Sequence, residues 1–314
     1  ALYAEAIPVA QIARTHGTPC FIYSRAALEQ NLLAYEEALS AVDHLTCFAV
    51  KANSNLAVLK VLALKGAGFD IVSGGELARV IAAGGDPTRV IFSGVGKTIE
   101  EMHAALDAGI HCFNVESPLE LEQLNDVAMQ RNVRAPVSIR VNPDVDAKTH
   151  PYISTGLKEN KFGVDIDDAP RIYAKANAMS NLNVQGIDCH IGSQITTTAP
   201  YLDALDKVLE LVAQLKKEGI EIHHLDLGGG LGISYGDDNP PDITEFTNTL
   251  LNRVAERGFA HLDIVLEPGR SLVGNAGVLL TQVEYLKPGA EKNFCIVDAA
   301  MTELMRPALY EAYH

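Results

Sequence analysis

The feature that most limits how this chain can fold is the alternation of short β-rich runs with longer segments of helical periodicity. β-Branched and aromatic residues fill the short runs, and apolar residues recur every three or four positions in the longer segments. The expected strands lie at residues 46–52, 69–73, 89–93, 112–116, 136–142, 184–191, 222–227 and 262–267. The expected helices lie at residues 55–65, 75–83, 98–108, 118–131, 167–179, 200–217 and 242–257.

Strand–helix units in series build a parallel sheet, and eight such units close naturally into a (β/α)8 TIM barrel. An open doubly wound sheet is the alternative α/β architecture. We favour the barrel because of the unit count and because no early G-x-G-x-x-G turn is present. After Glu267 the pattern changes to two expected strands, at residues 277–286 and 294–299. We therefore predict a barrel over residues 21–265, and an incomplete, mostly β second domain from residues 1–20 and 266–314.

Charge and cysteine usage limit the partners and the compartment. The 25 basic and 40 acidic residues leave a net charge of -15, which disfavours nucleic acid and anionic membrane as partners. The five cysteines are scattered and show no C-x-x-C spacing, which is typical of reduced, buried cysteines. We find no signal-peptide pattern and no apolar run as long as a membrane span. A cytoplasmic protein is expected, and no metal.

A barrel of this kind carries its active site at the C-terminal ends of its strands. Lys51 ends the first expected strand. A lysine there is usually a solvated charge, but desolvation by the surrounding apolar run would lower its pKa and make it a nucleophilic amine. His190 ends the sixth strand, either as a packed core residue or as a flat ring that stacks on an aromatic ligand.

The last two strands end in turns that suit an anion. Gly228–Gly230 follow the seventh strand, where close approach of the backbone to a phosphate is the physical use of such a run. Glu267-Pro268-Gly269-Arg270 ends the eighth strand. The ordinary interpretation is a surface turn with an ion pair. The functional one gives Glu267 a buried basic nitrogen and Arg270 a phosphate or carboxylate.

An amine, a phosphate loop, a flat ring and a carboxylate together suit pyridoxal 5'-phosphate. The lysine would hold the aldehyde of this cofactor and the loop its phosphate. The carboxylate would keep the pyridine nitrogen protonated, which favours reactions through a Cα carbanion.

Several motifs resemble a known family. FAVKAN at 48–53, HIGSQ at 190–194, GGGLGI at 228–233 and EPGR at 267–270 resemble the alanine-racemase-fold, pyridoxal-phosphate-dependent decarboxylases. NPDVD at 142–146, THPYISTG at 149–156, NKFG at 160–163 and MRPALY at 305–310 resemble the diaminopimelate decarboxylases among them. The resemblance covers essentially the whole chain. It implies a carboxy-lyase that converts meso-2,6-diaminopimelate to L-lysine, the last step of lysine biosynthesis, as a homodimer with shared active sites.

The resemblance also implies roles for individual residues. Lys51 and His190 would be catalytic. Arg270, Arg306 and Tyr310 would bind substrate carboxylates. Because Pro307 can begin a helix, a four-residue step would place Arg306 and Tyr310 on one side of it, although a helix-terminal arginine and a packing tyrosine would look the same. The cofactor-binding set would be Lys51, Asp70, Arg140, His190, Ser193, Gly228, Gly229, Gly230, Glu267, Gly269 and Arg270.

One departure from the family affects the chemistry. The family continues beyond Tyr313 into a β segment with a Cys-Glu-Ser-Gly-Asp motif, and its cysteine would donate a proton from the partner subunit. None of the five cysteines here lies in such a motif, so we interpret the sequence as truncated. Two alternatives stay open at this point. One is an ornithine- or arginine-type decarboxylase, which would give Arg306 no distal carboxylate to bind. The other is a non-catalytic binding protein of the same fold.

Overall fold

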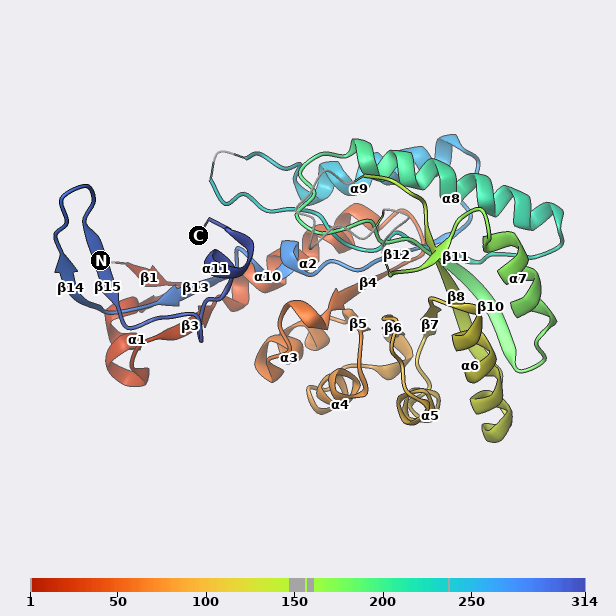
Figure 1. Cartoon of the computed structure of the whole chain (residues 1–314), viewed down its shortest axis with the longest axis horizontal. Coiled ribbons are helices and arrows are strands. Elements are labelled where there is room, and N and C mark those ends of the chain that lie inside the picture. The colour runs from red at the N-terminus through yellow and green to blue at the C-terminus, as the bar shows by residue number, and fades with distance from the viewer. Residues whose placement is uncertain (1, 147–155, 157–160, 237, 314) are drawn as a thin grey trace.

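The computed structural model describes residues 2–146, 156, 161–236 and 238–313. Its main sheet is a closed barrel of parallel strands in the order β4-β5-β6-β7-β8-β10-β11-β12, in which β12 pairs back onto β4 (Figure 1). The predicted barrel is therefore confirmed over the open sheet. The strands are β4 (His44–Ala49), β5 (Gly68–Ile71), β6 (Val90–Phe92), β7 (Cys112–Val115), β8 (Ala135–Asn142), β10 (Leu182–Asp188), β11 (His224–Asp226) and β12 (Asp263–Leu266), with β9 (Val164–Asp165) beside the end of β8.

The seven expected outer helices are all present. They are α3 (Leu56–Leu64), α4 (Gly74–Ala82), α5 (Ile99–Ala108), α6 (Pro118–Arg131), α7 (Ala169–Ala178), α8 (Ala199–Lys217) and α9 (Ile243–Glu256). The eighth position is taken by α2 (Arg25–Leu39), which packs between α9 and α3. This helix was not predicted, because it precedes the first barrel strand, and the expected units run from strand to helix. Its buried residues Leu28, Leu32, Tyr35 and Leu39 nevertheless recur at helical spacing.

Side-chain caps set the turns that lead from strands into helices. Ser73, Thr98 and Ser117 each accept a hydrogen bond from the backbone of the following first turn. Glu101 completes a capping box with Thr98 and also accepts a hydrogen bond from Gly74 N at 2.7 Å. The start of α5 is thereby tied to the start of α4, which keeps neighbouring loops at the barrel mouth in register.

The apolar core lies between the barrel wall and the helices. Phe48, Phe69, Phe92 and Phe113 come from four consecutive strands and are fully buried. Burial of side chains this large contributes roughly 1.5–3 kcal/mol each. Acidic and amide side chains occupy the ends of several strands and are just as buried. The polar strand ends are therefore held by a rigid apolar shell.

Two expected strands end early, and this changes where the site residues sit. Residues 50–52 form the 3-10 turn η1 (Val50–Ala52), in which Asn53 N donates to Val50 O at 3.0 Å. Lys51 therefore lies on a turn at the barrel rim, not in β4. Strand β10 ends at Asp188, so His190 lies in the loop that follows it.

The remaining elements are mostly short antiparallel strands, on the left of Figure 1. β3 (Cys20–Tyr23) pairs with β13 (Gly277–Leu280), β14 (Val283–Lys287) with β15 (Phe294–Val297), and β1 (Tyr3–Ala4) with β2 (Ile7–Pro8). The single strand expected at 277–286 is therefore divided into β13 and β14. Gln282, which lies between them, donates its backbone N–H to Asp298 Oδ1. The domain boundaries stay a prediction. The other helices are α1 (Val9–His16), η2 (Pro87–Arg89), α10 (Arg270–Val273) and α11 (Arg306–Tyr310).

Within the described residues, no helix combines the length and apolarity needed to cross a bilayer.

Candidate active site

The Lys51 amine and the Asp70 carboxylate meet at the mouth of the barrel. Lys51 Nζ donates to Asp70 Oδ2 at 2.5 Å. The Lys51 side chain is 49% exposed, whereas Asp70 is fully buried at the end of β5. Asp70 Oδ1 has no hydrogen-bond partner among the described residues. The amine is thus accessible from solvent, while its counter-ion is buried.

The expectation of a lowered pKa for Lys51 is wrong for the free side chain. Desolvation does oppose protonation of the amine, but the charges of Asp70 and Glu267 outweigh it and raise the pKa above its ordinary value. Desolvation is the largest single influence on the pKa, but the two carboxylate charges and the hydrogen bond to Asp70 together exceed it. Lys51 is therefore a protonated ammonium in this arrangement, and it needs to lose a proton before it can act as a nucleophile.

Three buried carboxyl groups gather inside the barrel below the lysine. Asp188 ends β10, Asp226 ends β11 and Glu267 follows β12, with one oxygen of each within 4.8 Å of the others. Asn114 Nδ2 donates to Asp226 Oδ2 at 3.1 Å and to Glu267 Oε1 at 3.4 Å. Ser93 Oγ donates to the same Glu267 oxygen at 3.5 Å.

Burial raises the pKa of each of these carboxyl groups, and the charge of Asp226 raises the pKa of Asp188 and of Glu267 further. The pKa of Asp188 and of Glu267 lies well above the ordinary value. That of Asp226 rises only to about 6, because Gly228 N and Asn114 donate hydrogen bonds to it. Oxygen ligands at this spacing could hold a cation, but the Asn114 amide points a donor into the group. The arrangement suits shared protons better than a metal ion.

Arg140 provides the cation nearest to this group. Its Nε lies 3.8 Å from Asp188 Oδ2, and its Nη1 donates to Glu116 Oε1 at 3.4 Å. The guanidinium also lies over the Phe162 ring, at 5.0 Å from the centroid. Glu116 in turn accepts hydrogen bonds from Gly94 N and Gly163 N. Arg140 is therefore oriented from both sides, as expected for a residue that borders a binding site.

The glycine turn after β11 is packed too closely for any side chain. A Cβ on Gly229 would lie 2.1 Å from Glu267 O, and one on Gly230 would lie 2.3 Å from Gly192 O. Gly228 and Gly230 also have positive φ, of 65° and 102°. Gly228 N donates to Asp226 Oδ1 at 2.9 Å, whereas Gly230 N has no partner among the described residues. Gly230 N is thus the amide of this turn that is available to an anion.

His190 lies against the same turn. Gly229 N donates to His190 Nδ1 at 3.1 Å, so the proton of the neutral ring belongs on Nε2. Burial, followed by the positive charges of Arg140 and Lys51, holds the pKa of His190 well below its ordinary value. The imidazole is therefore neutral and fixed in one tautomer. Its predicted stacking on a cofactor ring stays a prediction.

The predicted anion-binding side chains meet around Tyr235. Arg270 donates to Tyr235 Oη at 2.6 Å and, through Nη2, to Ser193 Oγ at 3.2 Å. Arg306 lies over the Tyr235 ring at 5.4 Å and over Tyr310 at 5.8 Å. The predicted placement of Arg306 and Tyr310 on one side of a helix is thereby confirmed by α11. The fold thus brings residues 193, 270, 306 and 310 together.

Gly269 connects this cluster to the lysine turn. A Cβ on Gly269 would lie 3.1 Å from Ala52 Cβ and 3.2 Å from Ala49 Cβ, so the β12 loop runs directly beside η1. The predicted residues of the four motifs thus form one continuous surface. The sequence motif at 149–155 and residue 160 of the motif at 160–163 lie outside the described residues.

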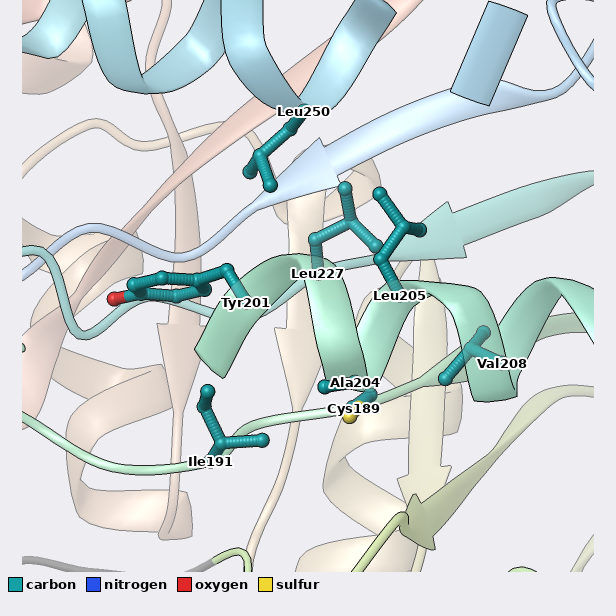
Figure 2. Close-up of a pocket in the computed structure, with 8 residues that line it drawn as sticks. All are labelled: Cys189, Ile191, Tyr201, Ala204, Leu205, Val208, Leu227 and Leu250. Atoms are coloured by element: carbon teal, nitrogen blue, oxygen red, sulfur yellow. The ribbon is translucent and has the colours of Figure 1, made fainter. Parts of the chain in front are cut away.

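A small apolar cavity of about 20 Å³ lies behind the glycine turn, between α8, α9 and the ends of β10 and β11 (Figure 2). Its walls include Cys189, Leu227 and Leu250. Burial raises the pKa of the Cys189 thiol, which argues against a nucleophilic role. Tyr201 Oη, at one end of the cavity, donates to Gly229 O at 3.2 Å. The cavity is therefore part of the packing that supports the turn, and it is too small for a substrate.

Sequence reasoning missed several site residues. Asn114, Asp188 and Asp226 were not assigned, although each is a polar residue in or at the end of a predicted barrel strand and is buried. That position was the available signal. Tyr235 lies in an irregular loop, and nothing in the local sequence indicated that two arginines would converge on it.

Comparison with known proteins agrees with this geometry. Residues 25–274 match the family of pyridoxal-dependent decarboxylases, over its pyridoxal binding domain. Fold and site thus define a pyridoxal-phosphate-dependent decarboxylase. Curated diaminopimelate decarboxylases from Pseudomonas aeruginosa and Vibrio cholerae are 59% and 56% identical, over 99% of this chain and 74% of each relative. The solved diaminopimelate decarboxylase of Helicobacter pylori, complexed with L-lysine, superposes with a TM-score of 0.94 at 42% identity, over 98% of this chain and 77% of that one. The chain belongs to the diaminopimelate decarboxylase family.

The residues at the barrel mouth fit the cofactor of this family. Lys51 provides an accessible amine, and the glycine turn has a concave backbone that an added Cβ would fill. Asp70 Oδ1 and Asp188 Oδ1 are buried oxygens that lack hydrogen bonds among the described residues. Such groups are costly unless a ligand or water completes them.

Proposed function

We propose that this protein removes the carboxylate from one end of meso-2,6-diaminopimelate as CO2 and releases L-lysine, with pyridoxal 5'-phosphate as its cofactor. The observation that carries the proposal is the Lys51 amine on the barrel rim, paired with Asp70 and close to the glycine turn, in a chain of this family. The ornithine- and arginine-type alternatives have no comparable support, because the reported relatives are diaminopimelate decarboxylases.

Each part of the mouth would hold one part of the cofactor. Lys51 would hold the aldehyde, Glu267 the ring nitrogen and His190 one face of the ring. Gly230 N, Ser193 and the backbone at Gly269 would hold the phosphate, with Arg270 beside it. Bound pyridoxal phosphate supplies an electron sink for the electron pair left on Cα when CO2 departs.

The protein's own groups control protons and exclude water. Asp70 keeps the Lys51 ammonium close and orients its amine at the barrel mouth, where it would meet the aldehyde of the cofactor. Glu267 lies in a buried setting with Ser93 and Asn114 as donors, so its carboxylate is directed by hydrogen bonds and is shielded from solvent. His190, neutral and buried, offers a flat ring without adding charge.

Substrate selection would depend on Arg270, Arg306 and Tyr310. Diaminopimelate carries an amino acid at both ends, and a guanidinium binds a carboxylate through two parallel hydrogen bonds. Arg306→Met should therefore raise KM for diaminopimelate by about 10- to 100-fold, because a charge-assisted hydrogen bond contributes roughly 1.5–3 kcal/mol. Steady-state kinetics on the variant would measure this. An unchanged KM would remove Arg306 from the distal carboxylate site.

The assembly and the compartment are further parts of the proposal. A homodimer in the cytoplasm, with active sites shared between subunits, is what the family resemblance implies. The five cysteines form no disulfide with one another, which fits a reducing compartment. Analytical ultracentrifugation of the purified protein would test the dimer, and a monomer at micromolar concentration would refute it.

The central experiment is the variant Lys51→Ala. The unaltered protein should gain a visible absorbance band on addition of pyridoxal phosphate, and borohydride should fix the cofactor to it. Lys51→Ala should show neither effect, and turnover should fall by at least about 10³-fold because the covalent contribution is lost. Lys60→Ala is the matched control, since Lys60 is an exposed residue of α3 that should leave both signals unchanged. Cofactor fixation in the Lys51→Ala protein would refute the assignment.

A further inference from the structure

Asp226 is connected to both ends of the proposed cofactor site, although the proposed mechanism assigns it no role. At one end, its Oδ1 accepts a hydrogen bond from Gly228 N at 2.9 Å, in the glycine turn. At the other, its Oδ2 accepts from Asn114 Nδ2 at 3.1 Å. The same amide nitrogen donates to Glu267 Oε1 at 3.4 Å. One buried side chain is therefore connected to the phosphate turn and to the carboxylate assigned to the ring nitrogen.

The contact with Gly228 shapes the turn. The N–H of Gly228 points to Asp226, whereas that of Gly229 points to His190. The carbonyl of Gly228 accepts from Glu267 N at 2.7 Å, which joins the turn to the end of β12. With those groups occupied, Gly230 N is left for an anion. The hydrogen bond that Gly228 N donates to the buried Asp226 carboxylate is charge-assisted and therefore stronger than a neutral one, so Asp226 is well suited to hold this backbone geometry.

The charges around Asp226 indicate that it shares a proton with its neighbours. Asp188, Asp226 and Glu267 lie within 4.8 Å of one another, and the nearest cation, Arg140, pairs with Asp188. Three carboxylates this close in a buried site cannot all be ionised. The pKa of Asp226 is the least raised of the three, and its negative charge raises the pKa of Glu267, so Glu267 holds the shared proton more tightly in the cofactor-free site. Asp70 also raises the pKa of Asp226, and Asp226 in turn raises the pKa of the buried Cys47, Cys112 and Cys189 thiols.

We propose that Asp226 is a positioning residue that couples the two ends of the cofactor site. Its carboxylate holds the glycine turn through Gly228 N, and through Asn114 and a shared proton it fixes the Glu267 oxygen that is assigned to the ring nitrogen. The inference rests on the proposed function, since it assumes pyridoxal phosphate at this mouth. Its consequence is that phosphate binding and ring protonation are linked through one side chain.

The phosphate end is tested with two probes, pyridoxal phosphate and pyridoxal, whose dissociation constants are measured by absorbance. Asp226→Ala should raise the dissociation constant of pyridoxal phosphate by about tenfold more than that of pyridoxal, because only pyridoxal phosphate has a phosphate to bind at the glycine turn. Asp188→Asn is the matched control: it removes a charge from the same group without contact to Gly228, and the ratio of the two constants should stay unchanged. An unaltered ratio in Asp226→Ala would overturn the first half of the proposal.

The ring end is tested on the cofactor-free protein by infrared spectroscopy of the carboxyl groups. The unaltered protein should show the carbonyl stretch of a buried protonated carboxyl. Asp226→Asn removes the negative charge that raises the pKa of Glu267, so this band should disappear at a lower pH. The variant should still fold, because the amide is nearly the same size as the carboxyl. An unchanged titration of the band in Asp226→Asn would overturn the shared proton. Should Asp226→Ala fail to fold, Asp226→Asn and the two probes still decide the proposal.

These outcomes are separable from a failure of the proposed function. If the unaltered protein binds no pyridoxal phosphate, the proposed function falls, and this inference with it. If it binds the cofactor and the Asp226 variants behave as it does, only this inference falls.

Discussion

Gly229→Ala should destabilise the protein although it adds only one methyl group. The new Cβ would lie 2.1 Å from Glu267 O and 2.9 Å from Glu267 C, whereas contacts below 3.0 Å are essentially never seen for a Cβ. About 1 Å of movement is therefore needed between two backbone segments, and neither can rotate away as a side chain would.

The magnitude follows from what that movement breaks. Overpacking alone contributes roughly 1–3 kcal/mol of destabilisation. Separation of the turn from β12 also strains the hydrogen bond from Glu267 N to Gly228 O, and each such bond adds about 1 kcal/mol. We expect the free energy of unfolding to fall by about 2–4 kcal/mol, a large fraction of the roughly 5–15 kcal/mol of a typical domain.

Chemical denaturation followed by circular dichroism is the suitable assay, because the chain contains no tryptophan for fluorescence. Gly96→Ala is the matched control, since an added Cβ there meets no heavy atom within 4 Å. It should change the free energy of unfolding by no more than about 0.5 kcal/mol. Equal stability of the two variants would refute the steric argument.

Two further predictions concern buried charges. The Lys97 side chain is fully buried and donates to Glu120 Oε1 and to the carbonyls of Gly94 and Asn114. Lys97→Met should lower the free energy of unfolding by about 3–5 kcal/mol, because it leaves the buried Glu120 carboxylate without its cation. Chemical denaturation would measure this, and a loss below about 1 kcal/mol would contradict it. The pKa of Asp226 is raised from 3.8 to about 6, so the folded state holds its proton more tightly than the unfolded state does. Its contribution to stability is therefore complete below about pH 4 and is lost as the pH rises through 6, by about 3 kcal/mol in total. Asp226→Asn should flatten the stability profile between pH 4 and 6, and an unchanged slope would contradict the assignment.

The parallel barrel and the location of the active site at one end of it could be predicted from the sequence, because both depend on local periodicity. Apolar alternation identifies a strand, and parallel strands bring their carboxyl ends to one edge. Lys51, the turn at 228–230 and Glu267 could therefore be grouped although more than 200 residues separate the first from the last. The helix at 25–39 was missed although its pattern is helical, because it precedes the first barrel strand, whereas each expected unit runs from a strand to a helix.

The electrostatics of the site could not be predicted in this way, because they depend on which buried groups face each other. Lys51 was expected to have a lowered pKa from its apolar neighbours in sequence, but Asp70, on the adjacent strand, reverses the direction. The same holds for the Arg270–Tyr235–Arg306 contact, which joins the loop after β11, the turn after β12 and the helix α11.

Local patterns of residue type and spacing were enough to predict the eight-unit repeat, the lysine, the glycine turn and the carboxylate. The fold was needed to show that Asp188, Asp226 and Glu267 share one buried space and that Asp226 contacts the turn. Barrel closure sets these distances by the register of β10, β11 and β12, and in a medium of low dielectric such distances determine which group keeps its proton.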